Sequence, residues 1–135
     1  MDTLAFFRNL KPEDWDKRVT DLWTVKDVLA HLVGWEREVA LEFRRTWGTD
    51  KKPWFVAIDD YNDFNKKIYN EFKNFTPEEL LLELKKWQAE VAGEIERVGG
   101  DKIRQRPHMS WLFDEGGEPH FEHHIEQIKK AINDK

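Results

Sequence analysis

The amino-acid sequence predicts an all-α fold in which the helices form one bundle. Apolar residues recur at steps of three and four over long stretches of the chain, and this is the period of one face of an α-helix. No stretch alternates clearly between apolar and polar side chains over four or more positions, as a half-buried strand would. Glycine and proline gather at a few points between these stretches, which predicts the loops that join the helices.

The first two helices are predicted over about residues 2–9 and over residues 24–46. The first is short. At the start of the second, Thr24 has the side chain of an N-cap, and Asp27 holds the position that closes a capping box. The apolar residues that follow keep a helical spacing: Val25, Val28, Leu29, Leu32, Trp35, Val39 and Phe43.

A third helix is predicted over about residues 58–73, where aromatic residues keep a helical rhythm. The fourth is predicted over residues 77–98. It follows Thr76 as its N-cap and starts with Pro77, since proline is favoured at the first helical position. Gly99 can supply the left-handed residue that ends this helix.

The last helix is predicted over residues 119–133 and begins with Pro119. One side of it is mostly apolar: Phe121, His124, Ile125, Ile128, Ala131 and Ile132. The loops between the helices suit an antiparallel bundle. Because the chain has 135 residues, residues 1–135 are expected to form a single domain.

The composition limits the partners and the location. The chain has 22 basic and 27 acidic residues and a net charge of −5. This balance argues against nucleic acid as the main partner, because such binding rests on a basic surface. No stretch approaches the roughly 20 apolar residues of a membrane span, and the N-terminus shows no secretory signal. We therefore expect a cytoplasmic location and no membrane partner.

The absence of cysteine excludes disulfides, thiolate metal ligands and a cysteine nucleophile.

The five histidines raise the question of a metal site. His120 and His124 are four residues apart on the last helix, so their side chains share one face and can reach one ion. His31 lies inside the apolar stripe of the second helix and is the candidate third ligand, because a histidine there needs a core partner or a ligand. His123 and His108 have no such arrangement. Spacing alone leaves two readings open, a three-histidine site in the bundle core and ordinary hydrogen-bonded histidines.

Three stretches of the chain resemble a known family. The stretches are WTVKDVLAHLVGWEREV at 23–39, HFEHHIEQI at 120–128 and DDYNDFNKKIYNEFKNFTPEELLLELKK at 59–86. The first two resemble the histidine motifs of the DinB/YfiT-like superfamily. The third is similar to the middle segment of its DfsB/ClbS-like branch. The resemblance covers roughly residues 12–133.

The resemblance implies a four-helix bundle of up-down-down-up topology with an extra helix in the long connection. It also implies a divalent metal held by His31, His120 and His124. Zinc or nickel suits three imidazoles best, and iron or manganese also fits such a site. The family usually has a first helix of about 20 residues, and here it is shortened. The apolar groove that this leaves is expected to be an association surface, which favours a homodimer.

The resemblance further implies a function. Characterised members are mostly thiol S-transferases or isomerases that use a low-molecular-weight thiol, and some are hydrolases. We therefore expect a metal-dependent thiol S-transferase or hydrolase acting on a small electrophilic molecule. In place of the usual Arg-Gly after the final histidine, the chain has Ile125 and Glu126, which weakens any inference about a thiol cosubstrate. The alternative is a non-catalytic small-molecule-binding or resistance/immunity module.

Five further residues are candidates for contacts around the site, and no catalytic residue can be named. Gln127 lies one turn after His124 and can orient a ligand or an imidazole. A hydrogen bond between helices is its alternative role. Glu36 can reach the mouth of a pocket or be a surface charge. Three tryptophans can line a pocket or be part of the core: Trp35, Trp54 and Trp111.

Overall fold

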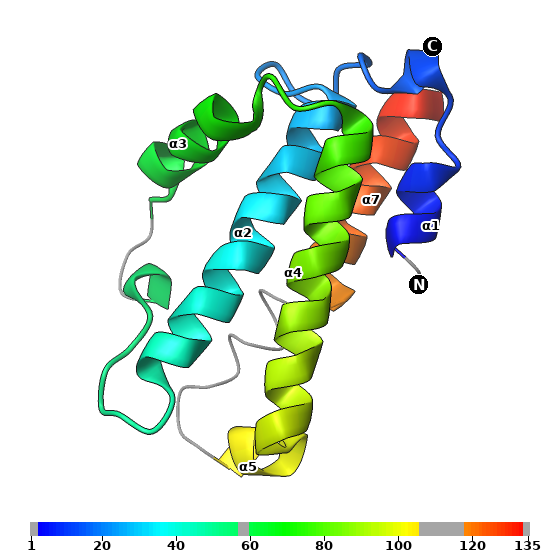
Figure 1. Ribbon diagram of the computed structural model, residues 1–135. Helices are drawn as coiled ribbons and strands as arrows, with labels where there is room; N and C mark the ends of the chain where they lie inside the picture. The colour runs from blue at the N-terminus through cyan, green and yellow to red at the C-terminus, as the bar shows by residue number, and fades with distance from the viewer. Residues whose placement is uncertain (1–2, 57–59, 106–117, 134–135) are drawn as a thin grey trace.

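The computed structural model describes residues 3–56, 60–105 and 118–133, except the side chains of Val56, Arg104 and residues 118–120. All regular elements within these ranges are helical (Figure 1). An isolated bridge between Arg18 and Thr24 is the one β-type pairing there. The predicted all-α class is therefore confirmed. The elements in order are α1 (Thr3–Arg8), the 3₁₀ turn η1 (Pro12–Asp14), α2 (Val25–Thr46), the 3₁₀ turn η2 (Trp54–Val56), α3 (Asn62–Phe72), α4 (Pro77–Val98), α5 (Gly100–Gln105) and α7 (Glu118–Asn133).

The two longest helices begin with the capping residues that the sequence indicates. Thr24 accepts a hydrogen bond from the backbone N–H of Asp27 at 3.3 Å, and the Asp27 carboxylate accepts one from the Thr24 N–H at 2.9 Å. Thr76 and Glu79 form the same reciprocal pair at the start of α4. Each pair satisfies backbone donors that have no partner within the helix. At the end of α4, Gly99 is the C-cap with the positive φ that glycine allows, at φ of +96°, but its ψ of 123° differs from the predicted left-handed helical conformation.

Helix α2 is the centre of the bundle. Every residue from Val28 to Glu36 is buried, so all sides of the helix are covered there. In Figure 1, α4 runs along α2 in the same direction, α7 runs in the opposite direction, and α3 lies on the outer side of α2. This parallel pair confirms the up-down-down-up topology that the resemblance implies, with α3 as the extra helix in the long connection. It arises because the long connection that carries η2 and α3 returns the chain to the end where α2 began.

The short α3 helix packs directly on α2 at a glycine. A Cβ atom added to Gly34 would lie 2.4 Å from Cδ1 of Ile68 and 2.7 Å from two further Ile68 carbons. Ile68 is 2% exposed. Since only glycine leaves room for this side chain, Gly34 sets how closely α3 approaches the central helix. It thereby fixes the aromatic residues around α3 against α2.

Helix α1 covers Thr3–Arg8 and is short, within the predicted range of about 2–9. In Figure 1 it lies beside α7, and the Nζ atom of Lys129 on α7 lies 5.9 Å from the ring centre of Phe6. Phe7 is fully buried and stacks on Trp15 with ring centres 5.9 Å apart. One buried aromatic residue therefore anchors α1 to the rest of the fold.

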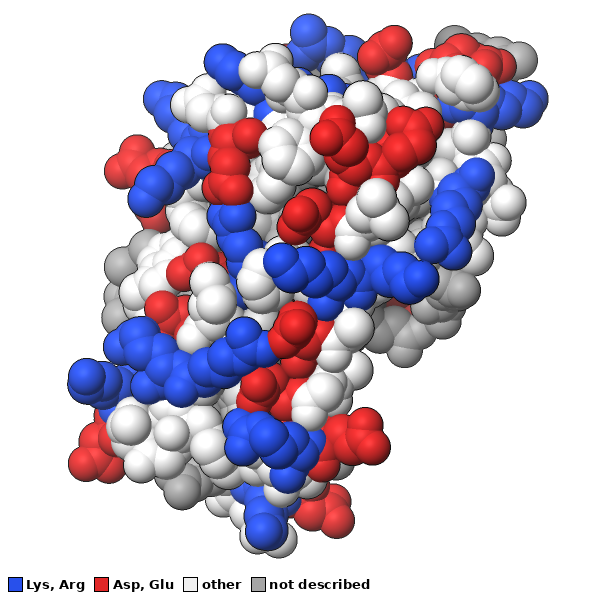
Figure 2. Space-filling view, viewed as in Figure 1, with Lys and Arg blue, Asp and Glu red and all other residues white. Residues whose placement is uncertain are grey.

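The surface over α2, α3 and α4 mixes charges of both signs (Figure 2). Arg44 on α2 pairs with Glu90 and Glu94 on α4, and Arg37 pairs with Glu71 on α3. Such exposed pairs contribute little stability each, but they leave no broad basic field on this face. None of the described helices combines the length and the apolar character that crossing a bilayer requires.

Candidate functional site

Two of the three predicted metal ligands meet inside the bundle. His31 comes from α2 and His124 from α7, and their ring centres are 4.7 Å apart with the ring planes inclined at 68°. The two residues are 9% and 8% exposed. The apolar stripe of α2 carries His31 into the core, and the packing of α7 on α2 brings His124 to it. The third predicted ligand, His120, belongs to α7, but its side chain lies outside the described residues.

Gln127 fixes the state of His124. Its Oε1 atom lies 2.9 Å from Nδ1 of His124. A carbonyl oxygen can only accept, so the imidazole donates from Nδ1. In this tautomer Nε2 is the ring nitrogen of the type that binds metals or accepts protons. Hydrogen bonds of this kind typically orient metal-binding histidines.

The geometry of the histidine pair suits a shared ion. Two imidazoles that bind one tetrahedral ion through bonds of about 2.0–2.1 Å have ring centres about 5 Å apart, close to the 4.7 Å observed. Within the described residues, however, no group of three or more histidine, aspartate or glutamate side chains is arranged to hold a metal. A metal centre at the pair therefore needs another ligand, and the one predicted is His120.

Trp23 covers one side of the pair, and sequence reasoning did not assign it a role. Its ring centre is 4.8 Å from that of His31. Backbone and side-chain bonds to Thr20 and Val19 hold Trp23 in a tight loop before α2. A large apolar residue directly before an N-cap commonly packs back onto the first turns of the helix. This position next to Thr24 is the signal that could have identified Trp23.

Trp35 and Trp54 belong to an aromatic cluster between α2, η2 and α3. Trp35 is 5% exposed, and its Nε1–H donates to Oδ1 of Asn65 at 3.0 Å. The Nε1–H of Trp54 donates to Oε1 of Glu38 at 2.6 Å. Among the described residues Trp35 therefore packs as a core residue, with its ring centre 6.3 Å from that of His31. Four aromatic rings surround it: Trp54, Phe55, Tyr61 and Phe64. Trp111 lies outside the described residues.

Glu36 is buried in α2, so the alternative of a surface charge is wrong. Its residue is 2% exposed, and its Oε2 atom has no hydrogen-bond partner among the described residues. Desolvation raises the pKa of this carboxyl to about 9, because burial penalises the charged form. At neutral pH the group is therefore a protonated acid. It can hold or donate a proton, but it brings no negative charge into the core.

Two hollows open on the surface near these elements. The smaller, of about 460 Å³, is lined by Arg18, Val19, Gln127, Lys130 and Ala131. It adjoins the site, because Gln127 is also the partner of His124.

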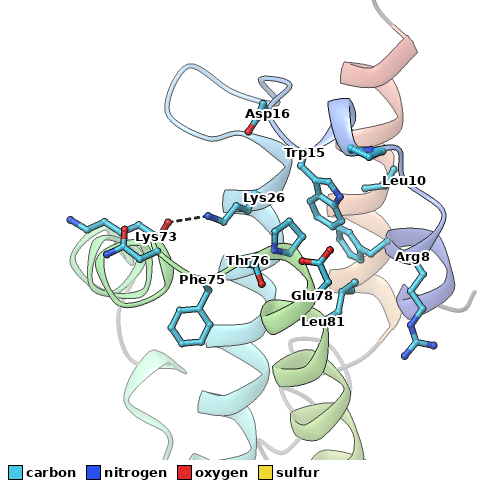
Figure 3. Close-up of a pocket in the computed structure, with 14 residues that line it drawn as sticks. Arg8, Leu10, Trp15, Asp16, Lys26, Lys73, Phe75, Thr76, Glu78 and Leu81 are labelled. Atoms are coloured by element: carbon cyan, nitrogen blue, oxygen red, sulfur yellow. Dashed lines mark hydrogen bonds between the residues drawn. The ribbon is translucent and has the colours of Figure 1, made fainter.

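The larger hollow is a groove of about 700 Å³ at the end of the bundle where α2 and α4 begin (Figure 3). Its apolar lining includes Phe7, Leu10, Trp15, Phe75 and Leu81, and Figure 3 shows Leu81 on the same side of the groove as Leu10 and Trp15. Neither His31 nor His124 is among its described lining residues.

Comparison with known proteins gives one result. A sequence model described as the DinB superfamily matches residues 1–128. No curated protein and no solved structure matches the chain significantly. The matched range includes α2 and most of α7, and so both histidines of the pair.

Proposed function

The chain belongs to the DinB superfamily, and we propose that it binds one divalent metal ion through His31, His120 and His124. The observation that supports this most is the 4.7 Å approach of the His31 and His124 rings inside the bundle. The hydrogen bond from His124 to Gln127 adds to it, because hydrogen bonds of this kind orient metal-binding histidines. Imidazole ligands suit zinc or nickel best, with iron or manganese as alternatives.

We propose that the reaction is the transfer of a thiol group to a small electrophilic molecule, or the hydrolysis of such a molecule. A divalent ion with an open position lowers the pKa of a bound water or binds an external thiolate. Since the chain has no cysteine, the sulfur of a thiol transfer would come from a low-molecular-weight cosubstrate.

The chain's own residues supply the surroundings for this chemistry. Gln127 holds the Nδ1 proton of His124 and so keeps that ring in one orientation. Trp23 covers His31 and excludes water from that side. Glu36 keeps its proton at neutral pH, so the α2 core around it stays uncharged.

Metal analysis of protein purified without a His-tag or a nickel column tests the proposal. We expect about one equivalent of divalent metal per chain, lost in His31→Ala and in His124→Ala. His123→Ala is the matched control, because His123 is the neighbouring, exposed histidine on α7. Failure to hold stoichiometric metal after incubation with zinc, nickel, iron and manganese would refute the proposal.

The groove in Figure 3 favours a second candidate, a non-catalytic module that binds an apolar small molecule. Trp15 lines the groove, so a bound ligand should quench tryptophan fluorescence. In this case quenching would persist in metal-free protein and disappear in Trp15→Leu. Quenching that depends on metal would favour the enzyme instead.

We also propose that the protein is a cytoplasmic homodimer. The support is an exposed apolar surface beside the short α1 helix. Leu82 of α4 is 69% exposed, and its neighbour Leu81 lines the groove next to α1. Light scattering coupled to gel filtration should give twice the chain mass of 16.3 kDa, and Leu82→Glu should give the monomer mass. A monomer for the unaltered chain would contradict the proposal.

A further inference from the structure

The smaller pocket beside Gln127 is lined by two positively charged residues, Arg18 and Lys130. Arg18 and Lys130 contribute a guanidinium and an ammonium group, which have no acceptor atoms. The Oε1 atom of Gln127 already accepts from His124, so its amide N–H groups remain as donors. The other described lining residues, Val19 and Ala131, are apolar. These donors and the two positive charges favour a ligand that brings acceptors and a negative charge.

The local structure holds Arg18 in place. The NH1 group of Arg18 donates to the backbone carbonyl of Asp21 at 2.9 Å. The backbone of Arg18 pairs with Thr24 in an isolated bridge, and the N–H of Val19 donates to the carbonyl of Trp23 at 2.9 Å. These bonds close a loop whose end is fixed to the start of α2. One guanidinium nitrogen is used by the loop, and the remaining N–H groups can serve a ligand.

The pocket and the histidine pair share two connections. The first is Gln127, which lines the pocket and bonds to His124. The second is the loop before α2, which carries Arg18 into the pocket and packs Trp23 on His31. A molecule held in the pocket is thus separated from the histidines by a single layer of side chains.

We propose that this pocket binds the oxyanion of a small molecule, a carboxylate or a phosphate group, and so selects anionic substrates for the neighbouring site. The role in substrate selection rests on the function proposed above, whereas the binding of the anion does not. Guanidinium and ammonium groups form strong, charge-assisted bonds with such oxyanions. The net charge of the chain is −5, so the protein as a whole does not attract anions. Attraction for an anion must come from the positive charges of the pocket itself.

Calorimetric titration of metal-free protein with inorganic phosphate and, separately, with malonate tests the binding. The protein is freed of metal on a chelating resin and kept in Tris at low ionic strength, since salt screens such contacts. We expect saturable binding of one equivalent, and the tighter of the two probes identifies the group. Loss of one charge-assisted hydrogen bond should weaken binding about tenfold in Arg18→Gln and in Lys130→Gln.

Lys129→Gln is the matched control, because Lys129 is the adjacent lysine on α7 and does not line the pocket. It should change the dissociation constant less than about twofold. Lys130 is exposed, so its replacement should leave the fold intact even if Arg18→Gln loosens the loop. Binding too weak to saturate at about 10 mM, or equal weakening in the Lys129 variant, would overturn the proposal.

His31→Ala separates this proposal from the metal proposal. It removes a proposed metal ligand and leaves every lining residue of the pocket unchanged. Anion binding that persists in this variant supports the pocket whether or not the protein holds a metal. Loss of anion binding in His31→Ala, with the fold intact by circular dichroism, would contradict an independent pocket.

Discussion

Replacing Glu36 by glutamine should stabilise the protein, and the gain should grow with pH. The structure buries this carboxyl to 2% exposure and leaves its Oε2 atom without a hydrogen-bond partner among the described residues. Its pKa rises from an ordinary value of 4.5 to about 9. In the unfolded chain the group ionises freely above pH 4.5, whereas in the folded chain it must keep its proton until about pH 9.

The direction and size of the effect follow from proton linkage. Because the folded state binds the extra proton, the contribution of Glu36 to stability is fully present below pH 4.5. It is lost as the pH rises towards 9. Each pH unit in that window costs about 1.4 kcal/mol. At pH 7 the free energy of unfolding is therefore lower by roughly 3 kcal/mol than in acid. Glutamine cannot ionise, so Glu36→Gln should recover most of this at pH 7 and little at pH 4.5.

Urea unfolding followed by circular dichroism at pH 5, 7 and 8.5 measures this difference. The variant is compared with the parent chain at each pH. The contributions of all other ionisable groups to the free energy of unfolding then cancel in the difference. Glu96→Gln, on the exposed side of α4, is the matched control and should change stability by less than about 0.5 kcal/mol. If Glu36→Gln is no more stable than the parent at pH 7 and follows the same pH profile, the carboxyl is ionised in the fold and the reasoning is wrong.

Two further predictions concern the site and the packing of α3. Gln127→Met removes the acceptor for Nδ1 of His124 and should weaken metal binding about tenfold or more, as measured by competition with a chelating dye; unchanged affinity would contradict the role of Gln127. Gly34→Ala forces a Cβ atom into Ile68 and should cost about 1–3 kcal/mol of stability in urea unfolding. Adding Ile68→Ala should cost less in this variant than in the parent chain, and strictly additive losses would show that the two side chains do not clash.

The limits of the helices could be predicted because their signals are local. The capping pair of Thr24 and Asp27 sits at the start of α2, and Thr76 with Pro77 marks the start of α4. Each signal depends on residues within one turn. The direction in which α4 runs relative to α2 is not local. It depends on how the long connection returns, which no residue spacing encodes, so here only the resemblance to a known family implied it.

The burial of Glu36 could be predicted from its position in the sequence but not from its residue type. Its position, four residues after Leu32 and three before Val39, places it on the apolar stripe that faces the core. The spacing therefore pointed inward, while the charge of the side chain suggested the surface. Trp35 shows the converse limit. Whether a tryptophan lines a pocket or fills a core depends on the close approach of α3 at Gly34, which is a long-range contact.

The meeting of His31 and His124 could be anticipated because both lie on core-facing positions of long helices. Arg18 and Lys130 could not, since they come together only when the loop before α2 folds against α7. A pocket made of single residues from separate elements leaves no motif in the sequence.

X-ray absorption spectroscopy at the metal edge tests the central claim most directly, because it counts the ligands of the bound ion. On protein reconstituted with zinc, we predict three imidazole nitrogens at about 2.0–2.1 Å and a loss of one imidazole, or of the ion, in His31→Ala. A zinc shell without imidazole, or one that His31→Ala leaves unchanged, would contradict the convergence of His31, His120 and His124 on one ion.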